Sequence, residues 1–200
     1  DFDNENILKF IDYVKNGGNL YLSSCCDKRL MKEFFGAKYQ GLTKEIKTYI
    51  SPNEELESCF YGFNEDYPMP INYQLPIFKV ENKGQVKGTI TLPYTNPADN
   101  IRFASIHSNP PGIKTDIPAV MINAYGKGKV IWIASAIEYD TRINFRRVFM
   151  NLFNKFIDKN DLTINAELSK NIEIVMFKTK NGLYLSLVDL TAGEEAFEHG

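Results

Sequence analysis

The sequence is poor in the side chains that most often carry catalysis or bind metals. Its 200 residues include two histidines, His107 and His199, and three cysteines, Cys25, Cys26 and Cys59. Adjacent cysteines rarely bond to each other, because the disulfide geometry is strained. No CxxC pair and no His/Cys cluster occurs, so we expect no metal and no cofactor. The unpaired thiols favour a reducing compartment such as the cytoplasm.

Long apolar runs and an excess of one charge are also missing. The longest apolar stretch, "VIWIASAI" at 130–137, is far below the ~20 residues that span a bilayer, so no membrane partner is predicted. Lys and Arg total 23 against 25 Asp and Glu, and the lysines are scattered, which argues against a nucleic-acid surface. No signal peptide is visible. Because the chain opens with Asp1 on a helical pattern, we expect it to be a piece of a longer polypeptide.

Apolar residues recur at helical spacing in three segments, and several short apolar runs predict strands. The first helix ends at "NGG" and leads directly into "NLYLS", a helix–glycine–strand unit of the α/β kind. The predicted helices are Asn4–Lys15, Lys28–Phe35 and Thr141–Ile157. The predicted strands are Asn19–Ser23, Lys44–Ser51, Gln85–Leu92, Phe103–Ser108, Ala119–Tyr125 and Val130–Ser135. The last two strands flank "GKGK", which predicts a β-hairpin and lacks the GxxxxGK[ST] spacing of a P-loop.

The residues after the third helix predict a second module. "DKNDLT" at 158–163 is a polar linker, and "IEIVMFKT" and "LYLSLVDL" then bracket "KNG". Asn181-Gly182 is the strongest hairpin signal in the chain and matches a type I′ turn. Two strands alone are marginal in water. We therefore expect an α/β domain at 1–160 and the start of a small all-β domain at 161–200.

The stretch "LSSCCDK" places Cys25 and Cys26 between a strand and a helix, as in a nucleophile elbow. A catalytic thiol needs a lowered pKa, a base within reach and oxyanion donors. The base would be His107, which no sequence spacing links to the cysteines. An elbow also needs small residues on both sides of the nucleophile, whereas Asp27 and Lys28 follow here. Structural cysteines are the favoured interpretation, and a thiol hydrolase using Cys25 or Cys26 with His107 is an alternative.

Acidic and aromatic residues give two further candidates. Glu138 and Asp140 are two residues apart, whereas glycosidase carboxylates face each other across a sugar, usually from separate elements. Glu138 is therefore interpreted as a favourable charge ahead of the helix that follows. The segment Pro52–Pro76 is predicted to be irregular, and its aromatic residues are of the kind that interfaces favour. The candidate interface or sugar-proximal residues are Phe60, Tyr61, Phe63, Tyr67, Met69, Tyr73 and His107.

Several segments in this order resemble a known family. They are "FIDYVKNGGNLYLSS", "LMKEFFGAKYQG", "FASIHSNPPG" and "IPAVMINAYGKGKVIWIAS", followed by the Phe-rich helix. Together they resemble the glutamine-amidotransferase-like domain of β-galactosidases and related glycoside hydrolases, called the β-galactosidase trimerisation domain. The closing "IEIVMFKTKNGLYLSLVDLT" is similar to the start of the small β-domain that follows it in such enzymes.

This resemblance implies a flavodoxin-like, class I amidotransferase-like sheet flanked by helices, downstream of a (β/α) barrel that carries the catalytic carboxylates. It implies that no catalytic residue lies in this chain. Amidotransferases place a His-x-Glu after a late strand, and here Ala136 stands where the histidine of that motif would precede Glu138. The family's opening strands are missing ahead of residue 1, so an upstream fragment or another chain is expected to complete the sheet.

The sequence thus predicts a non-catalytic association domain of a glycoside-hydrolase-like protein, which supports oligomerisation and shapes a neighbouring sugar site. The expected partners are its own upstream barrel or sister subunits in a homo-oligomer. Two other classes stay open besides the thiol hydrolase. One is a carbohydrate-binding module that uses the tyrosine-rich segment, and the other is a structural spacer that binds nothing.

Overall fold

The structure is a computed structural model that describes residues 2–95, 101, 102, 104, 109–156, 164, 166, 168 and 172–189. Contacts divide the chain into two compact units, Asp1–Asp158 and Lys159–Gly200. The predicted strand Phe103–Ser108 lies outside the described residues except for 104, as do His107 and His199. In the described part of the chain, no helix is long and apolar enough to cross a membrane.

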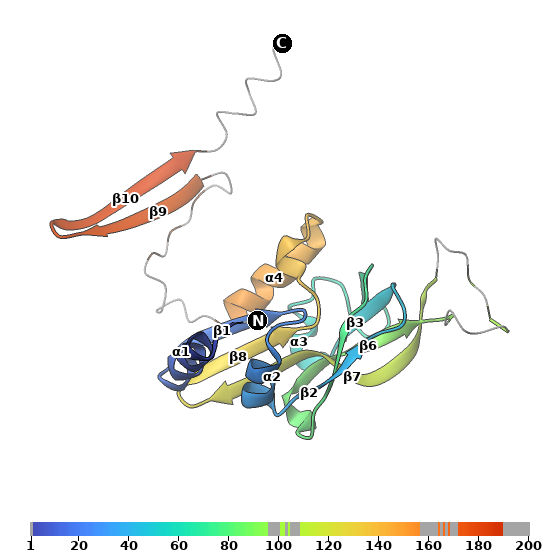
Figure 1. Ribbon diagram of the computed structural model, residues 1–200. Helices are drawn as coiled ribbons and strands as arrows, with labels where there is room; N and C mark the ends of the chain where they lie inside the picture. The colour runs from blue at the N-terminus through green and yellow to red at the C-terminus, as the bar shows by residue number, and fades with distance from the viewer. Residues whose placement is uncertain are drawn as a thin grey trace, which may run out of the picture. The chain divides into compact units, whose positions relative to one another are not determined.

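The first unit is built on a six-stranded mixed sheet (Figure 1). In spatial order its strands are β1 (Asn19–Ser23), β8 (Gly128–Ile133), β7 (Pro111–Tyr125), β6 (Val86–Pro93), β3 (Thr48–Pro52) and β4 (Met69–Ile71). β1 and β8 are parallel, and the other neighbours are antiparallel. A smaller antiparallel pair joins β2 (Lys38–Leu42) to β5 (Pro76–Lys79).

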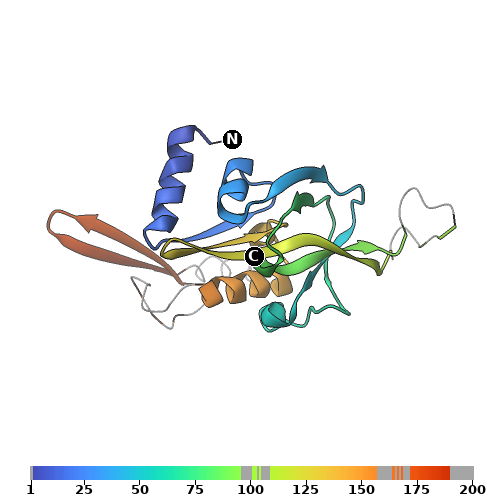
Figure 2. The same cartoon turned by 90° about the horizontal axis from the view of Figure 1, so that it is seen from below.

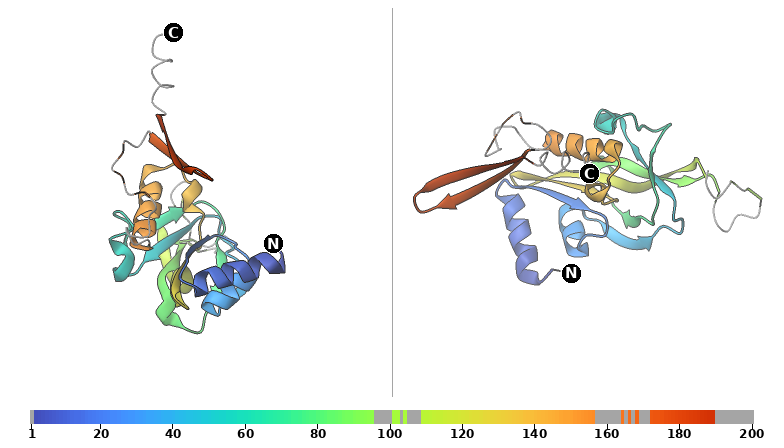
Figure 3. Two further views of the ribbon diagram at one scale, coloured as in Figure 1. Left: turned by 90° about the vertical axis from the view of Figure 1, so that its left-hand side faces the viewer. Right: turned by 90° about the horizontal axis from the view of Figure 1, so that it is seen from above.

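Helices cover both faces of the large sheet. Figures 2 and 3 show α1 (Asn4–Lys15) and α2 (Lys28–Phe35) on one face, and α3 (Glu54–Glu57) and α4 (Ile143–Phe156) on the other. This arrangement confirms the predicted α/β class. The predicted helices and the predicted hairpin at Gly126–Lys129 are also present, although β7 begins eight residues earlier than the strand predicted at Ala119–Tyr125.

Local capping explains where the first two helices begin and end. Asp3 accepts a hydrogen bond from the Asn6 amide at 2.7 Å, and Asp27 accepts one from the Arg29 amide at 2.9 Å, so each aspartate caps a helix. α2 ends at Gly36, whose φ of 60° suits a residue without a side chain. These signals lie within a few residues of each element, and the predicted bounds of both helices agree with the structure.

The core lies between the sheet and its helices. Trp132 on β8 is fully buried, and its ring meets Phe78 edge to face at 5.2 Å between centroids. On α4, the predicted apolar stripe is buried at four positions, Phe145, Val148, Leu152 and Phe156, whereas Phe149 is half-buried and Phe153 is exposed. This burial of large apolar side chains is the main source of the unit's stability.

The segment that the sequence predicted to be irregular contains regular structure. α3 follows β3 directly, and β4 pairs with β3 through Thr48–Ile71, Tyr49–Pro70 and Ile50–Met69. β2 and β5 were not predicted at all. Both are short, and within the part of the chain that the structure describes they pair with each other alone. Their formation therefore depends on tertiary packing rather than on local pattern.

The second unit contains a hairpin of β9 (Ile172–Thr179) and β10 (Gly182–Asp189), as the sequence predicted. The turn differs from the expectation. Its two loop residues are Lys180 and Asn181, neither of which has positive φ, and Gly182 at the start of β10 takes a φ of 147°. A type I′ turn needs positive φ at both central residues, so the turn is of another type.

The charge on Asp27 is predicted to stabilise the fold. The hydrogen bond from Arg29 lowers the pKa of Asp27 from 3.8 to about 2, so the ionised form stabilises the folded state above pH 4, and this contribution is lost as pH falls toward 2. Asp27→Ala should lower the free energy of unfolding at pH 7 by about 1 kcal/mol. Urea denaturation at pH 7, 4 and 2 measures it.

The difference between the wild type and Asp27→Ala should shrink between pH 4 and pH 2. Asp12→Ala on the exposed face of α1 is the matched control and should change stability by less than about 0.5 kcal/mol at every pH. A constant difference between the wild type and Asp27→Ala across this range would contradict the assignment.

Candidate functional site

The carboxyl ends of β1 and β8 are the first place to look for a site, because ligands of α/β sheets bind beyond the carboxyl ends of parallel strands. β1 is followed by Ser24, Cys25 and Cys26, and β8 is followed by Ser135 and the short 3-10 helix Ile137–Tyr139. Among the described residues, no cluster of His, Cys, Asp and Glu could hold a metal ion there or elsewhere.

Glu138 is the centre of a polar cluster at this edge. Its carboxylate accepts hydrogen bonds from the Tyr21 hydroxyl at 2.9 Å and from the Ser23 hydroxyl at 2.5 Å. Burial, followed by the charge of Glu138, raises the pKa of Tyr21 above its usual range, so this phenol stays protonated. Glu138 therefore joins the end of β8 to β1. It also lies in the first turn of the 3-10 helix ahead of α4, so its predicted role as a favourable charge there stays a prediction.

The tyrosine-rich segment reaches the same edge. Tyr73 shares a hydrogen bond of 2.5 Å with Ser135, and nearby Arg142 binds Asp140 through both carboxylate oxygens at 2.9 and 2.6 Å. The hydrogen bond from Arg142 lowers the pKa of Asp140. Each of these charged and hydroxyl groups has a protein partner, so the cluster fastens elements together and holds no free nucleophile–base pair.

The turn after β1 has one feature of a nucleophile elbow. Ser24 has a φ of 52°, its amide donates to the Ile133 carbonyl at 2.9 Å, and its own carbonyl accepts from the Trp132 indole at 3.0 Å. Cys25 next to it is exposed and Cys26 is half-buried. Burial raises the pKa of the Cys26 thiol to about 12, the opposite of the activation that a thiol nucleophile needs. His107, the proposed base, lies outside the described residues.

The predicted surface residues divide into core and exposed groups. Phe60 and Met69 are fully buried, so these two candidates belong to the unit's own core and not to an interface. Phe63 packs edge to face on Phe145 at 5.8 Å. The three tyrosines are exposed, with accessible fractions of 45% for Tyr61, 74% for Tyr67 and 44% for Tyr73. The sequence could not separate these groups, because burial depends on tertiary packing.

Two local devices hold the exposed tyrosines. The Asn64 side-chain oxygen accepts hydrogen bonds from the Asp66 and Tyr67 amides at 3.0 and 2.8 Å, which makes a tight polar turn under Tyr67. The Arg147 guanidinium of α4 lies 4.3 Å from the centre of the Tyr61 ring, a cation–π contact. These contacts hold the Tyr61 ring against α4 and the backbone of Tyr67 in a turn.

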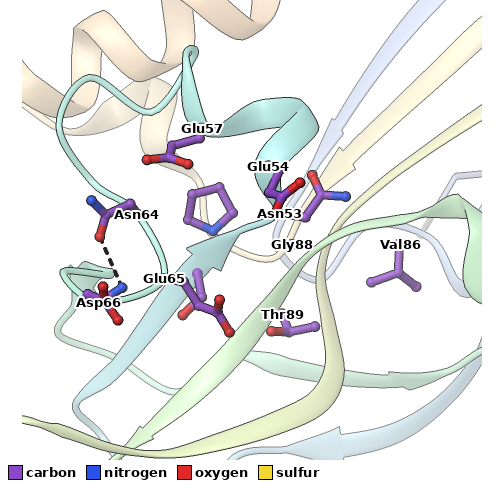
Figure 4. Close-up of a pocket in the computed structure, with 11 residues that line it drawn as sticks. Asn53, Glu54, Glu57, Asn64, Glu65, Asp66, Val86, Gly88 and Thr89 are labelled. Atoms are coloured by element: carbon purple, nitrogen blue, oxygen red, sulfur yellow. Dashed lines mark hydrogen bonds between the residues drawn. The ribbon is translucent and has the colours of Figure 1, made fainter.

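An acidic pocket of about 390 Å³ opens beside this turn (Figure 4). Carboxylates of Glu54, Glu57 and Glu65 surround it, from α3 and from the loop that follows. Asn53 also lines it, and among the described residues the buried Oδ1 of Asn53 has no hydrogen-bond partner. The sequence showed the acidic residues of this segment but gave no signal that they enclose a pocket with β6.

No model of a known protein family matches the chain, and no curated protein matches it. Solved structures resemble it in fold. One is a catalytic mutant of a GH42 beta-galactosidase from G. stearothermophilus, with a TM-score of 0.53 and 15% identity, covering 94% of this chain and 24% of that chain. The beta-galactosidase from Rahnella sp. R3 has a TM-score of 0.51 and 15% identity, covering 92% of this chain and 25% of that one.

A cytoplasmic protein from Salmonella typhimurium is also similar in fold, with a TM-score of 0.52 and 13% identity, covering 78% of this chain and 62% of that chain. The chain spans about a quarter of the length of the beta-galactosidases that it resembles. At these identities the likeness is one of fold.

The rate of cysteine alkylation tests whether Cys26, after β1, is an inert, half-buried thiol. Because burial raises the pKa of the Cys26 thiol, little thiolate forms at pH 8, so Cys26 should react with iodoacetamide far more slowly than an exposed cysteine. In a Cys25→Ser variant, peptide mass spectrometry should find Cys26 unmodified after Cys25 in the wild type has reacted fully. Alkylation of Cys26 at the rate of free cysteine would restore the thiol-hydrolase alternative.

Proposed function

We propose that this chain is a non-catalytic association domain of a glycoside-hydrolase-like protein, related to the β-galactosidase trimerisation domain. The observation that carries the proposal is the fold match over 94% of this chain and only 24% of a GH42 beta-galactosidase. A domain that forms a quarter of a larger enzyme can serve the enzyme without carrying its chemistry. The Cys26 thiol, whose pKa is raised by burial, is not an activated nucleophile.

The finer fold proposed is the flavodoxin-like, class I amidotransferase-like one. It is supported by the parallel β1–β8 pair, by helices on both faces and by Glu138 just beyond β8. β1 is an edge strand of the described sheet, so its outer edge is the place where further parallel strands would add. The sheet differs from that fold in its other strand pairs, which are all antiparallel.

The proposed contact surface is the exposed part of the tyrosine-rich segment, Tyr61, Tyr67 and Tyr73. Tyrosine is enriched at interfaces because a rigid, partly polar ring covers a large area at low entropic cost. The partner proposed is the protein's own catalytic barrel or a sister subunit, and the surface would also shape the mouth of a neighbouring sugar site. The proposed compartment is the cytoplasm.

Truncation of the most exposed tyrosine tests association. Tyr67 is 74% exposed and its ring makes no hydrogen bond within the described chain, so Tyr67→Ala should spare the fold. We expect it to weaken self-association, or binding to the upstream part of the protein, by about tenfold or more if Tyr67 is an interface hot spot. Multi-angle light scattering over a concentration series, and titration with the separately expressed upstream part, measure the two cases.

Leu8→Ala is the matched control for this experiment. Leu8 is also a large exposed apolar residue, but it lies on α1, away from the tyrosine-rich segment. Its loss should change neither mass nor affinity. Tyr73→Ala is less suitable as the main variant, because it also breaks the bond to Ser135. An unchanged mass and affinity in Tyr67→Ala would remove this surface from the proposal.

A second candidate function is sugar binding in the acidic pocket. The unpartnered, buried Oδ1 of Asn53 favours it, because an acceptor left without a donor gains most from a ligand hydroxyl. Glu54, Glu57 and Glu65 add further acceptors around the same space. Carboxylate and amide oxygens of this kind can accept hydrogen bonds from the hydroxyl groups of a sugar.

Titration with galactose and lactose, followed by NMR, tests this candidate. Saturable shifts should appear at the Asn53 and Asn64 side-chain amides, and Asn53→Ala should weaken binding about tenfold or more. Gln40→Ala, an exposed amide on β2, is the control and should bind as the wild type does. If neither sugar produces saturable shifts, the pocket has no such role.

A further inference from the structure

A second cleft, of about 490 Å³, lies beside β5 and is separate from the acidic pocket except at Val86 and Thr89. Its apolar wall is formed by Ile77, Val80, Val86 and Ile117, with Pro118 beside them. Its volume falls within the range of small-molecule sites, which are mostly apolar with a few placed polar groups. The association surface and the sugar candidate make no use of this apolar wall.

The cleft is built by a break in the β6–β7 ladder. Between the pairs Thr89–Pro118 and Thr91–Lys114, β6 contributes one residue and β7 contributes three, residues 115–117. The Thr115 hydroxyl donates to the Ile90 carbonyl at 2.5 Å and accepts from the Ile117 amide at 3.2 Å, so it provides partners for two backbone groups at the bulge. Bulges re-aim side chains and occur often beside functional sites.

The mouth of the cleft carries positive charge. Lys79 lines it, and Lys38 lies directly opposite Lys79 in the β2–β5 register. Both lysines are exposed, and neither has an ion-pair partner among the described residues. Like charges directly opposite in a ladder repel each other. Lys83 on the rim is different, because it is paired with Asp116 at 2.7 Å. Lys38 and Lys79 at the mouth could therefore bind an anion.

We propose that this cleft binds a small amphipathic organic anion, a free monocarboxylate with an apolar chain. The chain would cover Ile77, Val80, Val86 and Ile117, while the carboxylate lies between Lys38 and Lys79 and relieves their repulsion. The positive charge of the mouth favours the carboxylate of such a ligand, and the apolar wall favours its chain. This activity is independent of the proposed association function, so either can fail without the other.

Titration of the whole chain with decanoate, kept below its micelle concentration, tests the proposal. Methyl NMR should show saturable shifts at Ile77 and Ile117. Decylamine, which has the same chain and the opposite charge at pH 7, should bind about tenfold or more weakly, because a charge-assisted hydrogen bond is worth about 1.5 kcal/mol or more. No saturable shift with decanoate, or equal affinity for the two ligands, would overturn the proposal.

Variants that remove the charges of Lys38 and Lys79 test the contribution of the lysine pair to binding separately from that of the apolar wall. Lys38→Gln combined with Lys79→Gln should lower the affinity for decanoate about tenfold or more, with the melting temperature unchanged, because both side chains are exposed. Lys9→Gln on α1, an exposed lysine far from β2 and β5 in sequence, is the matched control and should bind like the wild type. Decanoate affinity unaffected by the double variant would overturn the assignment of the anion to these lysines.

Discussion

The pairing of β1 with β8 is the constraint on which the first unit depends. The two strands are over a hundred residues apart in sequence and pair in parallel along five positions, from Asn19–Lys129 to Ser23–Ile133. A parallel pair cannot be closed by a tight turn, so the chain between them must fold and return before the pair can form. The buried Trp132 and the acceptor Glu138 then fix the carboxyl ends of both strands against each other.

The same interactions explain why Tyr21, Ser23 and Cys26 are poorly suited to attack a substrate. Ligands of α/β sheets bind beyond these strand ends. Here, however, the hydroxyls of Tyr21 and Ser23 donate hydrogen bonds to Glu138, and burial keeps the Cys26 thiol protonated. A group that anchors the fold through a buried bond is not free to attack a substrate. We propose that the functional surface of this unit is instead the tyrosine-rich segment and the two clefts.

Sequence reasoning succeeded where structure is encoded locally. The bounds of α1, β1 and α2 were predicted to the residue, because each is delimited by a cap or a glycine within a few positions. It failed where long-range packing decides. Phe60 and Met69 have the composition of an interface, but Met69 pairs with Ile50 across β3 and β4, and both residues are core. Nothing in the local pattern distinguishes them from the exposed Tyr67.

At the two clefts, folding brings charged residues together in a way that the amino-acid composition does not indicate. A net charge of −2 with scattered lysines gives no sign of a charged site. Folding nevertheless gathers Glu54, Glu57 and Glu65 around one pocket, and the β2–β5 register sets Lys38 against Lys79 beside the other. Like charges placed directly opposite each other in a ladder, as Lys38 and Lys79 are, disfavour the pairing. The bulge at residues 115–117 lies at the same cleft, beside the apolar wall. A wall that suits an apolar chain and lysines that suit an anion thus arise from two separate features of strand pairing, the bulge and the β2–β5 register.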